Sequence, residues 1–236
     1  MDTKVGKVPK VSTDLSRADK WGNFKVRWAF SRMSYQVEPG VYAVGNPDQD
    51  SIVFVSANYK LSFDILRREL KGLDAWIMVL DTKGINVWCA AGEGTFGTQE
   101  IVNRIELSRL KEIVNHRKLI LPQLGAPGVA AHEVKKLSGF LVIYGPVRAS
   151  DILPFLDAGM VASREMRQVR FSLYDRFLLV PVELVTGLRY LLFIIAGFFL
   201  LAGLSRDGYS SVMAADVGIR STINLLLAYL AGTVVS

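Results

Sequence analysis

The sequence is poor in metal-binding and redox side chains, with one cysteine and two histidines among its 236 residues. A single cysteine cannot form an internal disulfide bond, which fits a reducing compartment. His116 and His132 belong to no H-E-x-x-H motif and Cys89 has no partner for a C-x-x-C pair, so the usual zinc and iron–sulfur patterns are excluded. Cys89 is therefore either a small core residue or a reactive thiol.

The first 22 residues contain lysines but no apolar stretch, so we do not expect them to act as a secretory signal peptide. We expect residues 1–20 to form a flexible segment in the cytosol. The formal net charge is +6, but the basic residues are spread out and form no stripe interleaved with aromatic residues. We therefore expect no nucleic-acid partner.

Between residues 40 and 173, short β-rich runs alternate with helical patterns, as in an α/β domain built from βαβ units. The expected strands are 41–45, 52–56, 75–80, 85–90, 118–121, 139–144 and 168–173. The expected helices are 61–72, 98–116, 128–139 and 150–159. In the longest helix we expect Thr98 to cap the first turn, and the apolar spacing predicts one buried face formed by Ile101, Ile105, Leu107, Leu110 and Val114.

Two long apolar runs follow this domain. Residues 184–204 carry a single charge, Arg189, and their length matches the roughly 20 residues of a bilayer crossing. A second run, charged only near its start, occupies 217–236. We therefore expect a soluble domain at 21–175 and a transmembrane region with two spans at 176–236.

The charges around the first apolar run predict its orientation. The loop 205–216 offers Arg206 against Asp207 and Asp216, whereas four basic residues precede the run: Arg164, Arg167, Arg170 and Arg176. Because cytoplasmic flanks are enriched in lysine and arginine, we expect the soluble domain on the cytoplasmic side of the inner membrane.

The densest group of candidate functional residues lies at 83–98. It contains a G-x-G-x-x-G pattern at Gly92, Gly94 and Gly97, between an expected strand and an expected helix, as in a dinucleotide-binding loop. Glu93, however, would place a negative charge where a pyrophosphate must lie, and no acidic residue ends a following strand to hold a ribose. A membrane-attached NAD(P)-binding oxidoreductase using this loop is therefore kept as an alternative.

The segment Asn86-Val87-Trp88-Cys89-Ala90-Ala91-Gly92 resembles the cap-helix motif of the mercury-methylating corrinoid proteins, the HgcA family. The similarity covers roughly residues 20 to 185, through PGVYAVG (39–45), ANYKLSFD (57–64), LDTKG (80–84) and LPQLGAPG (121–128). It implies a Rossmann-like corrinoid-binding domain, related to that of the large subunit of corrinoid iron–sulfur proteins, followed by a membrane bundle usually of five helices. Residues 86–92 would then form a short cap helix below the corrin ring rather than part of a strand.

The resemblance also implies a cofactor, cobalamin or a related corrinoid, with the thiolate of Cys89 as the lower axial ligand to cobalt. The D-x-H-x-x-G element with which many corrinoid proteins offer a histidine is missing here. Gln123 and Gly125 follow an expected strand, at the edge of the sheet where ligands of α/β proteins lie. The other residues expected to contact the corrinoid are Asn86, Val87, Trp88, Ala90, Ala91, Gly92 and Thr95.

A thiolate below cobalt suits methyl transfer to mercury. Cysteine thiolates push electron density through a metal, as in some haem enzymes, and this would help a methyl group leave as a carbanion equivalent. Hg(II), a soft electrophile, needs a methyl group in that form. The resemblance thus implies a corrinoid-dependent methyltransferase, with a methyltetrahydrofolate-type donor or its methyltransferase and a ferredoxin-like electron donor with two [4Fe–4S] clusters as partners.

Two features depart from the family pattern. The motif normally ends in Gly-Lys, whereas here Gly92 is followed by Glu93, a charge reversal beside the expected ligand. The membrane region holds about two spans, so we expect the sequence to be a fragment or a truncation. A corrinoid methyl carrier for another acceptor and a noncatalytic membrane interaction module are further alternatives.

Overall fold

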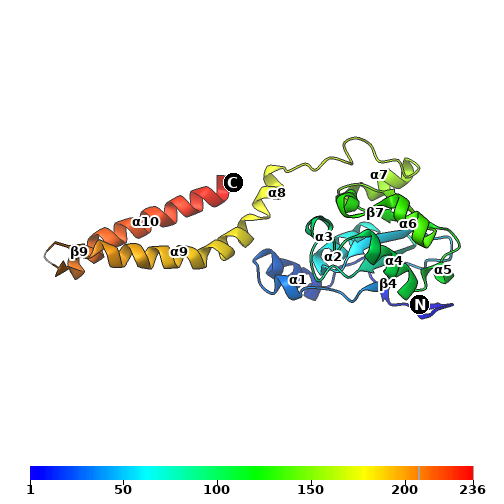
Figure 1. Ribbon diagram of the computed structural model, residues 1–236, viewed down its shortest axis with the longest axis horizontal. Helices are drawn as coiled ribbons and strands as arrows, with labels where there is room; N and C mark the ends of the chain where they lie inside the picture. Colours follow the sequence, from blue (N-terminus) through cyan, green and yellow to red (C-terminus); the bar gives the residue numbers. More distant parts are fainter. Residues whose placement is uncertain (207, 236) are drawn as a thin grey trace. The chain divides into compact units, whose positions relative to one another are not determined.

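The computed structural model describes residues 1–206 and 208–235, and the chain divides into two compact units. Unit 1 comprises Met1–Asn23 and Met33–Val169, and unit 2 comprises Phe24–Arg32 and Arg170–Ser236. Unit 1 is a mixed α/β structure, and unit 2 contains two long apolar helices (Figure 1). Asp207 and Ser236, which belong to the expected loop and second span, lie outside the described residues.

A mostly parallel sheet of six strands forms the centre of unit 1, in the order β3-β4-β6-β5-β7-β8. Strands β5, β6, β7 and β8 run parallel to one another, whereas β4 is antiparallel to β6 and parallel to β3. The strands of this sheet are β3 (Lys10–Val11), β4 (Gly40–Val44), β5 (Val53–Ala57), β6 (Ala75–Leu80), β7 (Lys118–Leu121) and β8 (Leu141–Tyr144). A separate hairpin pairs β1 (Asp2–Thr3) with β2 (Gly6–Lys7).

Helices connect the strands and cover both faces of the sheet. They are α1 (Arg17–Arg27), η1 (Arg32–Ser34), α2 (Lys60–Glu69), α3 (Val87–Glu93), α4 (Thr98–Leu107), α5 (Leu110–Ile113), η2 (Gln123–Gly128), α6 (Ala131–Ser138), η3 (Ala149–Asp151) and α7 (Ile152–Asp157). On one face, alternate side chains of the strands form a core with α3, α4, α5 and α6, and on the other face a second core forms with α2 and α7. Because β6 is buried on both faces, its six residues are all apolar, as in a central parallel strand.

The strands expected from the sequence agree with most strands of the sheet. Strands β4, β5, β6 and β7 lie within one residue of the expected ranges, and β8 begins two residues later than expected. The strands expected at 85–90 and 168–173 are wrong. Residues 87–93 are helical because the side chain of Asn86 caps a helix, and the second range runs into a helix that is capped by the side chain of Ser172.

The single helix expected at 98–116 is wrong as well. The chain breaks between α4 and α5 at Arg109, which has a left-handed backbone with a φ of 51°. Leu107, the last residue of α4, lies off the face that carries Ile101 and Ile105 and is exposed, whereas the other four apolar residues are buried. Thr98 is not the cap, because Gly97 holds that position and the Thr98 hydroxyl instead accepts a hydrogen bond of 2.8 Å from the backbone N–H of Ala130.

The N-terminal residues carry regular structure. Within the range 1–20, expected to form a flexible segment, the structure contains β1, β2, β3 and the start of α1. Strand β3 pairs with β4 at the edge of the sheet, and the side chain of Arg67 on α2 donates a hydrogen bond to the carbonyl oxygen of Ser12. These contacts join the N-terminal residues to the sheet and to α2 within unit 1.

A buried group of charges fastens α1 to α2. Asp64 is fully buried and pairs with Lys60 and Arg67 at 2.8 Å each. The same two cations reach Asp19 on α1, at 2.6 Å and 3.0 Å. Burial acts to raise the pKa of Asp19, but hydrogen bonds from Lys60, Ser16 and Arg67 outweigh it and hold this pKa well below its usual range.

Unit 2 contains a helical hairpin with little of its apolar surface covered. Helix α8 (Leu173–Phe177) precedes α9 (Val180–Ala202), and the short strands β9 (Leu204–Ser205) and β10 (Gly208–Tyr209) lead into α10 (Ser211–Val235). The Tyr229 hydroxyl lies 2.9 Å from the backbone oxygens of Glu183 and Leu184, and the aromatic ring fits against Gly187. Both long helices are long and apolar enough to cross a membrane, and most of their side chains are exposed.

We expect Asp64→Asn to lower the free energy of unfolding of unit 1 by about 3–5 kcal/mol, because a neutral amide removes the buried carboxylate and leaves the buried Arg67 and the half-buried Lys60 with only Asp19 of the two carboxylates that they share. The measurement is a urea titration of the full chain in detergent micelles, followed by tryptophan fluorescence.

Asp14→Asn is the matched control, because Asp14 pairs with Lys71 at an exposed site and should contribute under about 1 kcal/mol. Equal effects of the two substitutions would contradict a structural role for the buried group.

The folded-state pKa of Asp19 is lowered, so ionised Asp19 stabilises the folded chain above about pH 4, the pKa of an unfolded aspartate. This stabilisation is lost as the pH falls further.

Candidate functional site

Helix α3 lies at the carboxyl ends of the parallel strands. It follows β6 in the chain and contacts both β5 and η2, the short helix after β7. The chain leaves β5 towards β6 on one side and leaves β7 towards β8 on the other side. This edge is thus a topological switch point, the place where open α/β sheets bind ligands.

The side chain of Asn58, directly after β5, fixes the loop that leads into α3. Its Oδ1 atom accepts hydrogen bonds from the backbone N–H groups of Thr82 and Gly84, at 3.2 Å and 2.9 Å, and lies 2.8 Å from the Thr82 hydroxyl. Both Asn58 and Thr82 are buried. From the other side, the carboxylate of Glu100 on α4 accepts a hydrogen bond from the N–H of Asp81 at 2.9 Å.

Asn86 begins α3 and contacts the only thiol. Its side-chain oxygen accepts a hydrogen bond from the backbone N–H of Cys89 at 3.1 Å, as an N-cap does. Its amide nitrogen lies 3.4 Å from Cys89 Sγ and donates to it. One asparagine therefore both starts the helix and orients the sulfur atom.

Helix α3 has a buried face and an exposed face. Val87, Ala90 and Ala91 are buried in the core of unit 1, whereas the exposed face carries Trp88, Cys89, Gly92 and Glu93. Trp88 is 58% exposed, which is unusual for a tryptophan. Of the residues expected to contact a cofactor in this helix, only Trp88, Cys89 and Gly92 therefore point to the open side, with Asn86 at its start, and the alanines and valine instead hold the helix in place.

Two glycines of η2 allow this short helix to lie close to α3 and to the loop that follows α3. A Cβ atom on Gly125 would lie 2.5 Å from the ring of Phe96, and one on Gly128 would overlap the carbonyl oxygen of Phe96 and lie 2.9 Å from that of Ala91. Phe96 itself is fully buried. The expected cofactor residue Gly125 thus has a packing role.

The remaining expected residues lie beside α3. The Thr95 hydroxyl donates a hydrogen bond to the carbonyl oxygen of Ala90, at 3.4 Å. Gln123 at the start of η2 has a buried side-chain oxygen without a hydrogen-bond partner among the described residues. An orphaned acceptor of this kind beside an exposed helix face is the type of group that a ligand amide or hydroxyl can satisfy.

The glycine pattern at 92–97 does not have the geometry of a dinucleotide loop. Gly92 lies within α3, Gly94 ends it in a left-handed conformation with a φ of 85°, and Gly97 precedes α4. A loop and most of α3 therefore separate the end of β6 from the first of these glycines, whereas a dinucleotide fingerprint begins directly after its strand.

Sequence reasoning missed Asn58, Glu100, Phe96 and Gly128, which position α3. A polar asparagine directly after a fully buried strand was the available signal for Asn58. No local pattern marks the other three, because their contacts join segments that are distant in the sequence.

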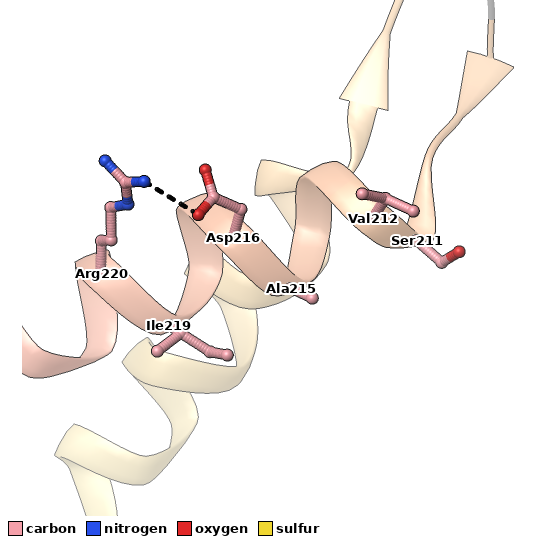
Figure 2. Close-up of a pocket in the computed structure, with 6 residues that line it drawn as sticks. All are labelled: Ser211, Val212, Ala215, Asp216, Ile219 and Arg220. Atoms are coloured by element: carbon pink, nitrogen blue, oxygen red, sulfur yellow. Dashed lines mark hydrogen bonds and ion pairs between the residues drawn. The ribbon is translucent and has the colours of Figure 1, made fainter.

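Metal binding by side chains alone is not supported in the described ranges. Among residues 1–206 and 208–235, no group of three or more His, Cys, Asp or Glu side chains is placed to hold a metal ion. A hollow in unit 2 is lined only by residues from the start of α10, and its charged pair Asp216 and Arg220 is joined at 3.0 Å (Figure 2). This hollow offers no metal-ligating cluster either.

Comparison with known proteins identifies a family. The CdhD family, described as "CO dehydrogenase/acetyl-CoA synthase delta subunit", matches residues 28–156. The match spans the sheet from β4 to β8 together with α3 and η2. Helices α8, α9 and α10 lie outside it.

Curated relatives match the same region. The acetyl-CoA decarbonylase/synthase complex subunit gamma of Archaeoglobus fulgidus is 33% identical over 128 residues, which cover 53% of this chain and 27% of that protein. The same subunit of Methanopyrus kandleri is 30% identical, with the same coverage. The corrinoid/iron-sulfur protein large subunit of Moorella thermoacetica is 27% identical over 129 residues, which cover 54% of this chain and 28% of that protein. The chain thus matches little more than a quarter of each relative.

Gly128→Ala should destabilise unit 1 by about 1–3 kcal/mol, because the added methyl group forces η2 away from Phe96 and Ala91. Urea titration of the full chain in detergent measures this loss.

Gly92→Ala is the matched control. A Cβ atom there meets no atom within 4 Å, and alanine is the better helix former by about 1 kcal/mol, so stability should hold or rise. If Gly128→Ala were as harmless as Gly92→Ala, the close approach would not be a constraint.

Proposed function

The chain belongs to the CO dehydrogenase/acetyl-CoA synthase delta subunit family, and from this membership we propose that its α/β unit binds a corrinoid and takes part in methyl transfer. Its relation to a corrinoid/iron-sulfur protein large subunit supports this cofactor. We assign residues 21–175 to a Rossmann-like corrinoid-binding domain. The exposed face of α3, at the switch point of the sheet, is the proposed binding surface.

The residues of this surface fit a corrinoid. A corrin ring brings its own nitrogen ligands, so the protein needs to supply only one axial ligand, and Cys89 is an exposed thiol on a rigid helix. Gly92 has no side chain and leaves room beside the sulfur. The buried oxygen of Gln123 is free to accept a hydrogen bond from an amide at the ring periphery. When bound, a corrinoid supplies a cobalt ion that can carry a methyl group.

The roles of the protein residues follow from their contacts. Cys89, as a thiolate, would hold the cobalt ion and donate electron density to it. The amide of Asn86 holds the sulfur from one side at 3.4 Å. Trp88 offers a large apolar surface to the cofactor, and Thr95 ties the end of the helix to Ala90.

We further propose that the acceptor is Hg(II), which gives methylmercury, because Asn86–Gly92 resembles the HgcA motif and a thiolate donor favours departure of methyl as a carbanion equivalent. Hg(II) is then a substrate rather than a resident metal. Transfer to another acceptor is the second candidate, favoured by relatives named as acetyl-CoA decarbonylase/synthase subunits.

The proposed partners follow from the same resemblance. A ferredoxin-like protein with two [4Fe–4S] clusters would return electrons to the cofactor, and a methyltetrahydrofolate-type donor or its methyltransferase would supply the methyl group. One relative is named for both a corrinoid and an iron–sulfur component, which supports an electron-transfer partner.

We propose that α9 and α10 cross the cytoplasmic membrane, with the α/β unit in the cytoplasm. The helices have 23 residues each within the apolar stretch, enough for a core of about 30 Å. The basic residues before α9 support this orientation, since cytoplasmic flanks are rich in arginine.

The exposed thiol on α3 is the observation that carries the proposal, and Cys89→Ala tests it. Full-chain protein in detergent, titrated with cobalamin, should develop the optical spectrum of cobalt–thiolate coordination, and this spectrum should be lost in the variant. Cobalamin should also protect Cys89 from maleimide, and the labelling is specific because the sequence has no other cysteine.

An unchanged spectrum in Cys89→Ala would refute the ligand assignment. Saturable NAD(P)H binding without corrinoid binding would instead favour the oxidoreductase alternative, and binding of neither cofactor would favour a noncatalytic membrane module.

Glu93→Lys tests the charge reversal in the motif. Lysine in the last turn of α3 interacts favourably with the helix dipole, by about 0.3–1 kcal/mol, where glutamate interacts unfavourably. We expect more methylmercury from the lysine variant in an assay with the ferredoxin-like partner.

Glu106→Lys is the matched control, since Glu106 is also exposed but lies on α4. Equal methylmercury formation by the native chain and both variants would rule out Glu93 as a determinant of activity.

A further inference from the structure

The segment around α1 alternates basic and aromatic residues. This stretch is an exception to the expectation that basic and aromatic residues do not interleave in the chain. Its basic residues are Arg17, Lys20, Lys25, Arg27 and Arg32, and its aromatic residues are Trp21, Phe24, Trp28 and Phe30. The proposed methyl transfer uses none of them.

The aromatic residues of α1 share one side. Trp21 and Phe24 are three residues apart and so lie on one side of the helix, and the ring of Trp28, in the turn after the helix, lies 6.1 Å from that of Phe24. Trp21 is 60% exposed and Phe24 is 50% exposed. Large aromatic side chains that stay exposed together indicate a surface with a partner.

The side chains that α1 can present to a partner carry a net positive charge. Asp19 is the only acidic residue in α1, and its carboxylate is engaged by Lys60 and Arg67 at 2.6 Å and 3.0 Å. The basic residues of the helix therefore set its outward charge, which is complementary to an anionic surface.

The elements that share a compact unit with Phe24–Arg32 favour a membrane over other anionic partners. Phe24–Arg32 belongs to the same compact unit as the apolar helices α9 and α10. The family match begins at residue 28, so α1 lies before it, just as the apolar helices lie after it. The end of α1 is therefore grouped with these helices, whereas its first seven residues, Arg17–Asn23, belong to unit 1. The basic and aromatic composition of the helix is that of an interfacial helix.

We propose that α1 and the turn after it lie in the headgroup region of an anionic lipid bilayer, with the indoles of Trp21 and Trp28 at the boundary of the acyl chains and the lysines on the lipid phosphates. Indole side chains prefer this depth, and each basic residue near an anionic leaflet contributes about 1 kcal/mol. The proposal rests on the membrane crossing of α9 and α10 but not on corrinoid binding.

Tryptophan fluorescence tests the position of the helix. A chain with Trp28→Phe and Trp88→Phe keeps Trp21 and the buried Trp76, whose signal is a constant background. The full chain is reconstituted into phosphatidylcholine vesicles with and without phosphatidylglycerol. We expect Trp21 to be quenched by lipids with a nitroxide near the top of the acyl chain and shielded from aqueous iodide, more strongly with phosphatidylglycerol.

Two variants act as controls. A chain with Trp21→Phe and Trp28→Phe reports on Trp88 of α3 in place of Trp21 and should show no quenching by the nitroxide lipids. Adding Lys20→Glu and Lys25→Glu to the Trp21 reporter should abolish the extra quenching in phosphatidylglycerol vesicles.

Sedimentation of the vesicles after an alkaline wash separates the two proposals. A chain that is washed off overturns the membrane crossing and the interfacial position together. A chain that stays with the vesicles but shows iodide quenching of Trp21 without nitroxide quenching overturns the interfacial position alone. Loss of nitroxide quenching on addition of a single-stranded oligonucleotide that binds the chain would assign this face to nucleic acid and also overturn it.

Discussion

The buried amide of Asn58 is the constraint on which the candidate site depends. It joins the end of β5 to the loop after β6 through two backbone hydrogen bonds and the Thr82 hydroxyl. A buried acceptor that makes three such contacts cannot move without leaving N–H groups unsatisfied, at about 1–3 kcal/mol for each. The direction in which α3 leaves the sheet, and so the position of Cys89, is fixed at this point.

The packing of η2 against Phe96 and Ala91 holds α3 in place from the other side of the switch point. Glycine at 125 and 128 is required by the close approach of two segments and not by an unusual backbone angle, since neither has a positive φ. The helix is therefore clamped on its apolar face while its thiol face stays open. Such an arrangement suits a surface that must hold a large flat cofactor without reorganising, because a preorganised site loses less entropy on binding.

The sequence was sufficient for the sheet, because strands buried on both faces, such as Ala75–Leu80, are continuous apolar runs. The strand predicted at 85–90 was wrong because the cap formed by Asn86 outweighs the preference of the apolar run for a strand. Only the resemblance implied a helix there. Sequence reasoning also failed at Arg109, where nothing local marks the left-handed turn. For the site, the motif identified Asn86 and Cys89, whereas Asn58, Phe96 and Gly128 act through contacts between distant segments and so leave no local pattern.

The family match covers the middle of the chain, and the large exposed apolar surfaces lie mainly before and after it. Residues 28–156 contain α3, the residues that position it and the switch point, and most of their large apolar side chains are buried, with Trp88 on α3 among the exposed exceptions. The flanking regions instead carry exposed aromatic and aliphatic residues, on α1 at one end and on α9 and α10 at the other. Burial of apolar surface stabilises a protein only when something covers it. Under the proposed membrane crossing, lipid would cover these flanking surfaces, whereas the site is stabilised by the core of unit 1. The two regions could then vary independently.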